Sequence, residues 1–160
     1  MIPFGLPAWT APAPPATPTA PLRAQYSWGY ADAHGEGRGT LSLLLEPSSG
    51  RLVLELHGLG ERLLLLEGDR SAGYRVQIPR RELDRHAPTL LGLPLPFLPA
   101  LQDAEGLLRL LRTGEGPGVK VTRRDGEGPV RLRYRGADEQ GREVHVWLER
   151  KHWEWLSPPT

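Results

Sequence analysis

The chain has 160 residues and a formal net charge of +1, with 39% hydrophobic residues, 19 glycines, 17 prolines and no cysteine. This length suits one domain, and the balanced charge gives no electrostatic basis for binding nucleic acid or an anionic membrane surface. The lack of cysteine excludes disulfides, thiolate zinc sites and cysteine nucleophiles. No apolar run approaches the roughly 18 residues that span a bilayer, and no signal peptide is evident.

Residues 1–23 differ in composition from the rest of the chain, because proline alternates here with alanine and threonine. This composition favours extended polyproline II structure and cannot form a packed core. We therefore expect a Pro/Ala-rich tail or linker over 1–23, a single domain over 24–156 and a short tail over 157–160. A ligand for a proline-binding module is the alternative for the first segment. Linkers of this kind commonly follow an export signal or a membrane anchor.

From residue 24 onward, apolar and polar residues alternate in short runs that are separated by turn residues. Tyr26, Trp28 and Tyr30 recur at period two, which places three aromatic side chains on one face of a strand. The short turns between the runs predict antiparallel meanders, five strands before residue 79 and three after residue 118. The expected strands are 25–34, 40–46, 51–57, 62–67, 74–78, 119–122, 130–135 and 144–149.

An apolar segment at residues 90–101 separates the two sets of strands and is too rich in proline for one helix or a sheet strand. We predict a short helix over 80–86 before it and a second helix over 104–112 after it. Asp103 is the expected N-cap of the second helix, and Gly114 is its expected end. The predicted fold is mainly β with short helices (α+β). It is a curved antiparallel sheet or incomplete barrel of about eight strands, covered by a helix–loop–helix flap.

Patterns that carry catalysis or metal binding are missing from the sequence. The five histidines are scattered and lack metal-ligand spacing, and there is no nucleophile elbow, P-loop or dinucleotide-binding motif. We therefore predict no catalytic residue, no metal site and no cofactor, and a protein that is not an enzyme.

A basic stripe runs along one predicted strand at Arg131, Arg133 and Arg135. It is either a phosphate-binding surface or a polar sheet face paired with Glu143 and Glu149 on the next strand. The structural interpretation is favoured because no aromatic residues are interleaved with the basic ones as stacking platforms. A separate aromatic group, Trp147, Trp153 and Trp155, is either covered by the N-terminal segment or forms an interaction patch.

The apolar side chains exceed what a small two-layer core needs. A curved sheet cannot be filled by one short helix, so the remaining volume is closed by loops or occupied by a ligand with apolar surface. The predicted lining of such a cavity consists of Leu43, Leu54, Leu56, Val76, Leu91, Leu95, Phe97, Leu98, Leu108, Leu111, Val121, Leu132 and Val146.

Two stretches have a wider resemblance. The first runs from Glu82-Leu83 to Gly92-Leu93-Pro94-Leu95-Pro96, with Leu98 and Leu101 following; the second runs from Asp125-Gly126 to Tyr134 and on to Val144-His145-Val146-Trp147-Leu148. They resemble the lid and the closing hairpin of the LolA/LolB family of bacterial lipoprotein-localisation factors. The resemblance covers about residues 25–151. It implies an incomplete antiparallel barrel that is covered by helices and whose cavity takes lipoprotein acyl chains.

Two family features differ in this chain. No lipobox cysteine is present, so membrane anchoring as in LolB is not implied. Leu59, between two glycines, is the candidate for the family's protruding leucine.

The leading hypothesis is a cell-envelope carrier or chaperone, in the periplasm, that binds acyl chains or a lipidated protein under the flap. An envelope protein is a further expected partner, and nucleic acid is not expected. The alternative is a non-enzymatic structural or protein-interaction module with the same fold and a filled core. For location, the alternative is the cytoplasm.

Overall fold

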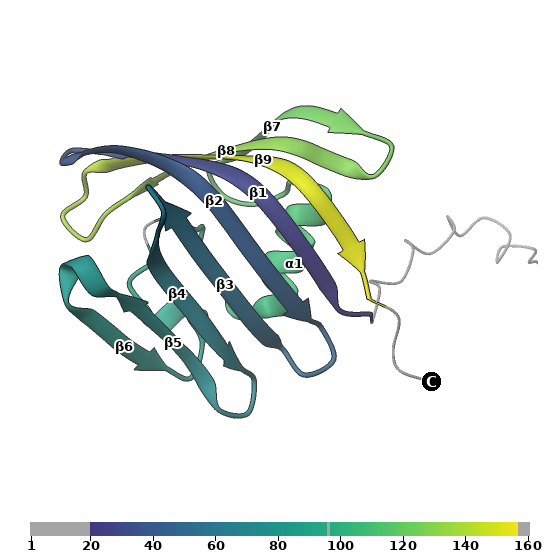
Figure 1. The fold of residues 1–160 in the computed structure, drawn as a ribbon, viewed down its shortest axis with the longest axis horizontal. Coiled ribbons are helices and arrows are strands. Elements are labelled where there is room, and N and C mark those ends of the chain that lie inside the picture. Colours follow the sequence, from purple (N-terminus) through teal and green to yellow (C-terminus); the bar gives the residue numbers. More distant parts are fainter. Residues whose placement is uncertain (1–19, 96, 157–160) are drawn as a thin grey trace, which may run out of the picture.

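The computed structural model describes residues 20–95 and 97–156, which form one antiparallel sheet and one α-helix (Figure 1). Most of the two predicted tails lies outside these residues. The strands are β1 (Leu22–Asp32), β2 (Gly35–Glu46), β3 (Arg51–Gly58), β4 (Glu61–Asp69), β5 (Gly73–Ile78), β6 (Leu83–Ala87), β7 (Val119–Asp125), β8 (Gly128–Ala137) and β9 (Glu143–Trp155).

The sheet has the strand order β6-β5-β4-β3-β2-β1-β9-β8-β7. The first strand therefore pairs with the last one, and this pairing joins the meander β1–β6 to the meander β7–β9. The sheet is open, since β6 and β7 form its two edges, and it does not roll up into a closed barrel. The predicted antiparallel meanders are confirmed, with nine strands in place of about eight.

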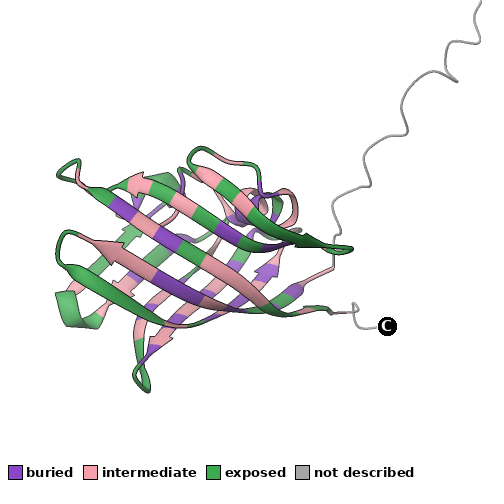
Figure 2. Ribbon diagram, turned by 90° about the horizontal axis from the view of Figure 1, so that it is seen from above, coloured by how far each residue is buried: buried purple, intermediate pink, exposed green. Residues whose placement is uncertain are grey.

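One face of the sheet carries the hydrophobic core. The alternation predicted for β2 and β3 is confirmed, because Leu43 pairs directly with Leu54 and both side chains are buried. The same row continues across the sheet to Leu66 on β4 and Val76 on β5. Such cross-strand rows of apolar side chains fix the register, because a slip by one residue would turn every leucine toward water. Figure 2 shows the resulting alternation of buried and exposed residues along the strands.

The helix predicted over residues 80–86 is wrong. Pro79–Arg81 form a single 3-10 turn, and Leu83–Ala87 form the edge strand β6. Glu82 between them has a left-handed backbone with φ of 51°, which reverses the chain onto β5. Hydrogen bonds to the otherwise open edge of β5 override the weak helix propensity of this segment. The predicted helix–loop–helix flap is therefore a loop followed by one helix.

The second predicted helix is confirmed as α1 (Ala104–Thr113). Asp103 caps its N-terminus, since the side chain accepts a hydrogen bond from the backbone N–H of Gly106 at 3.1 Å. Gly114 ends it in the left-handed conformation, and its N–H donates to Leu110 O. The apolar face of α1 joins the core of the sheet. Among the described residues, no helix has the length and apolarity needed to span a membrane.

A bulge in β9 separates the C-terminal tryptophans. Tyr26 on β1 pairs with Arg150 whereas Gln25 pairs with His152, so Lys151 is an extra residue that shifts the alternation. Trp153 consequently lies on the core side, where its indole N–H donates to Tyr26 Oη at 2.7 Å.

Trp147 lies on the opposite face of the sheet. It pairs with Gly29, where its indole occupies the space that a side chain on the glycine would need. The predicted interaction patch of three tryptophans is therefore not one continuous surface.

The predicted basic stripe on β8 forms the ion pairs that the structural interpretation favours. Arg131 pairs with Glu149 at 3.0 Å and Arg135 with Glu143 at 3.9 Å, both across to β9.

Candidate functional site

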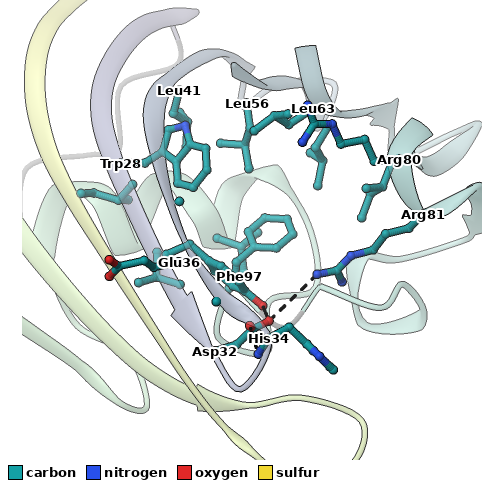
Figure 3. A pocket seen from close by; sticks show the side chains of 18 residues that line it. Trp28, Asp32, His34, Glu36, Leu41, Leu56, Leu63, Arg80, Arg81 and Phe97 are labelled. Carbon is teal, nitrogen blue, oxygen red and sulfur yellow. Dashed lines mark hydrogen bonds and ion pairs between the residues drawn. The ribbon is translucent and has the colours of Figure 1, made fainter. Parts of the chain in front are cut away.

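A pocket of about 360 Å³ lies between the core face of the sheet and the loop that precedes α1 (Figure 3). Apolar side chains from both meanders and from this loop form its interior. They are Trp28, Tyr30, Leu41, Leu56, Leu63, Leu64, Ile78, Phe97, Leu98, Val146 and Leu148. The pocket therefore depends on the β1–β9 pairing, which brings residues near position 28 next to residues near position 147.

Trp28 is held in place at the pocket wall by its own polar group. The indole Nε1 donates to the backbone oxygens of Thr40, at 3.1 Å, and His57, at 3.2 Å. The ring is thus fixed by β2 and β3 and presents its apolar surface to the pocket.

A β-bulge widens the apolar wall on β4. Leu56 of β3 pairs with Leu64 whereas His57 pairs with Arg62, so Leu63 is the extra residue. The bulge turns two consecutive side chains, Leu63 and Leu64, toward the pocket instead of one.

The flap loop, residues 90–102, covers the pocket from the other side; Pro96 within it is not among the described residues. Its base is tied together, since the Leu90 N–H donates to Gln102 O at 2.9 Å. Leu90 and Leu93 are buried in the core and anchor the loop. Phe97 and Leu98 are half-buried and line the pocket, with the Phe97 ring near its centre in Figure 3.

The mouth of the pocket contains a buried carboxylate. The side chain of Asp32 is only 6% exposed, and it accepts hydrogen bonds from Tyr30 Oη at 2.6 Å and from the backbone N–H of His34 at 2.8 Å. Burial acts to raise the pKa of Asp32, but these hydrogen bonds, together with the charge interactions with His34 and Arg81, outweigh burial and lower the pKa below its usual value. Burial and the neighbouring Asp32 raise the pKa of Tyr30 to about 12.

Two arginines of the 3-10 turn lie on the opposite rim. Arg81 extends its guanidinium toward Asp32, with 4.0 Å between Nη2 and Oδ2 (Figure 3). Arg80 is paired with Glu61 at 2.5 Å. The site therefore combines an apolar interior with a charged rim, an arrangement that suits an amphiphilic ligand.

No family model and no curated protein matches this chain.

The thirteen residues predicted to line a cavity divide into three groups. Leu56, Phe97, Leu98 and Val146 line the pocket. A second cavity of about 270 Å³, beneath the flap loop, is lined by Leu91, Leu95 and again Leu98. The third group is buried in the core and consists of Leu43, Leu54, Val76, Leu108, Leu111 and Leu132. Val121 is partly buried and packs at the margin of the core.

Sequence reasoning missed several residues of the pocket. The period-two aromatics on β1 are a usable signal, since their spacing places Tyr26, Trp28 and Tyr30 on one face. Arg80 and Arg81 give no such signal, because the sequence predicts a helix over 80–86, on which arginines are ordinary surface residues.

Proposed function

We propose that this protein is a non-enzymatic carrier or chaperone that binds an acyl chain in the pocket between the sheet and the flap loop. The observation that carries the proposal is the apolar interior of about 360 Å³, closed on one side by Phe97 and Leu98 of the flap loop. Each buried methylene of a ligand contributes about 0.8 kcal/mol, so an acyl chain supplies the binding energy without directional chemistry.

The volume of the pocket supports a small cargo. Ligand pockets span about 300–1,000 Å³, and this one lies at the lower end of that range. We therefore expect it to hold a single acyl chain, either free or attached to a protein, and not several chains at once.

Loading and release require the flap loop to move. Phe97 and Leu98 stand between the pocket and the outside, whereas Leu90 and Leu93 hold the base of the loop in the core. A local opening of the loop tip leaves the sheet intact, as in other lids that gate a binding site.

The proposed location is the cell envelope, by the resemblance to the LolA/LolB family. In that family an incomplete barrel is covered by helices, whereas in this chain an open sheet carries one helix and the flap loop.

The proposal is tested by placing a charge in the pocket. Phe97→Glu buries a carboxylate among apolar side chains, so we expect binding of a fluorescently labelled fatty acid to weaken by at least about tenfold. Leu59→Glu is the matched control, because Leu59 is 96% exposed at the tip of the β3–β4 turn and does not line the pocket.

Fluorescence titration gives the affinity, and circular dichroism checks that both variants keep the sheet. Unchanged binding by a folded Phe97→Glu variant would refute the carrier. Native mass spectrometry of the purified protein gives an independent result, since a carrier is expected to retain lipid.

The alternative, a protein-interaction module with a filled core, draws on the exposed tryptophans. Trp147 is 41% exposed and Trp155 is 37% exposed, unusual values for the largest apolar side chain. It has less support, because the β9 bulge places Trp147 and Trp155 on opposite faces of the sheet. A single apo mass together with a partner-dependent change in tryptophan fluorescence would favour the module.

A further inference from the structure

The rim of the pocket is charged, although its interior is apolar. Asp32 and Glu36 come from β1 and β2, and Arg80 and Arg81 come from the turn after β5. The pocket thus opens between two chain reversals, one of which supplies carboxylates and the other guanidinium groups. A ligand that leaves its polar end at the mouth must match these charges.

The two carboxylates of the rim do not face the ligand position above Phe97. The side chain of Asp32 is 6% exposed and already accepts hydrogen bonds from Tyr30 Oη and the His34 backbone N–H. Glu36 is exposed, and its carboxylate points away from Phe97 and Arg81 (Figure 3). A head group above Phe97 would therefore meet the guanidinium of Arg81 and not a carboxylate that faces it.

Arg81 is the cation of the rim with unused binding capacity. Its side chain is 57% exposed, and its ion pair with Asp32 is long, at 4.0 Å. A guanidinium has five N–H donors in a planar fork, so one edge can face Asp32 while another binds a second anion. Arg80 is also exposed, but its guanidinium is held much closer to a carboxylate, with 2.5 Å to Glu61, so its charge is better compensated than that of Arg81.

We infer that the cargo is a single-chain amphiphile with a carboxylate head, and that Arg81 binds this carboxylate at the mouth while the chain lies beside Phe97. This inference rests on the proposed carrier function and adds the chemical class of the ligand. Arg–carboxylate pairs form parallel N–H···O bonds, which fix the orientation of the ligand as well as adding affinity.

Three ligands with the same chain and different heads test the inference: laurate, lauryl alcohol and laurylamine. Each is titrated against the full chain by displacement of a neutral fluorescent probe. We expect laurate to bind the wild type about fivefold more tightly than the alcohol, the size expected for one partly exposed ion pair. The preference for laurate should shrink at high ionic strength because salt screens an exposed pair.

Arg81→Gln should bind laurate and the alcohol equally, with the affinity for the alcohol unchanged. Arg85→Gln is the matched control, since Arg85 is an exposed arginine of β6 that does not line the pocket. Arg81→Glu reverses the charge and should prefer laurylamine to laurate. This gain of binding cannot come from a variant that fails to fold.

The outcomes separate the two proposals. If neither laurate nor lauryl alcohol binds the wild type, the carrier function fails and the inference fails with it. If the alcohol binds but laurate gains nothing, or if Arg81→Gln weakens both ligands alike, the carboxylate inference alone is overturned.

Discussion

Asp32 shows how one side chain at the pocket mouth connects stability to the site. Its carboxylate is almost fully buried, yet its pKa is lowered, because hydrogen bonds from Tyr30 and the His34 backbone favour the charged form more than burial opposes it. The charge remains compatible with burial since Arg81 lies 4.0 Å away. The pKa of Tyr30 is raised to about 12, mainly by burial and additionally by the Asp32 carboxylate.

We predict that replacing this carboxylate lowers the stability of the protein in a pH-dependent way. A folded-state pKa below the unfolded one stabilises the protein above the unfolded pKa of about 3.9, and this stabilisation is lost as the pH falls through the folded value. Asp32→Asn should cost about 1 kcal/mol at neutral pH. The difference from wild type should shrink below about pH 4. Urea unfolding at several pH values measures this, and a constant difference at every pH would contradict it.

At the scale of the element, α1 shows that local sequence signals set its ends. Asp103 satisfies the backbone N–H of Gly106, and Gly114 adopts the left-handed conformation that glycine allows at a helix end. Gly106 in the first turns is the weak point of this helix, because glycine lowers helix propensity.

Gly106→Ala should stabilise the protein by about 0.5–1 kcal/mol, through helix propensity and lower entropy of the unfolded chain. The substitution fits, because a Cβ at Gly106 would have Leu101 Cδ2 as its nearest contact, at 3.7 Å. Asp103→Ala removes the cap and should cost about 1 kcal/mol, which gives an opposite shift in the same urea titration. An unchanged unfolding midpoint for Gly106→Ala would show that helix propensity at this position does not limit stability.

At the scale of the whole molecule, β1 holds the two meanders together. It pairs with β2 on one side and with β9 on the other. Leu22 at its start is fully buried between Leu45 and Trp155, its partners on those strands. The ordered sheet therefore begins before residue 24, where the sequence placed the start of the domain.

Two shortened chains test the role of the β1 start. A chain that begins at residue 25 lacks Leu22 and Ala24, both fully buried, as well as their hydrogen bonds to β2 and β9. It should be at least about 3 kcal/mol less stable than a chain that begins at residue 20, because a buried leucine alone is worth about 2–5 kcal/mol. Equal denaturation midpoints for the two chains would show that the start of β1 does not contribute to holding the meanders together.

Predictions that depend on residues close together in the sequence are confirmed, whereas those that depend on tertiary contacts are incomplete or wrong. Alternation in β2 and β3 and the caps of α1 depend on neighbours within a few residues, and these predictions are confirmed. The helix predicted over 80–86 is wrong because part of this segment pairs with the open edge of β5 and forms β6, and that edge is a tertiary feature. The cavity lining was predicted from which residues face inward, and this alone does not separate a packed core from a pocket wall.

The sequence by itself determined that this chain forms a mainly antiparallel β domain with one capped helix and a proline-rich apolar loop. These features follow from side-chain period, turn residues and proline chemistry, all of which act locally. Only the tertiary structure decided that β1 pairs with β9 and that Phe97, Trp28 and Val146 line one pocket. It also decided that Arg81 stands at the mouth. A pocket is the space that distant segments leave unfilled, so its lining depends on how whole elements pack together.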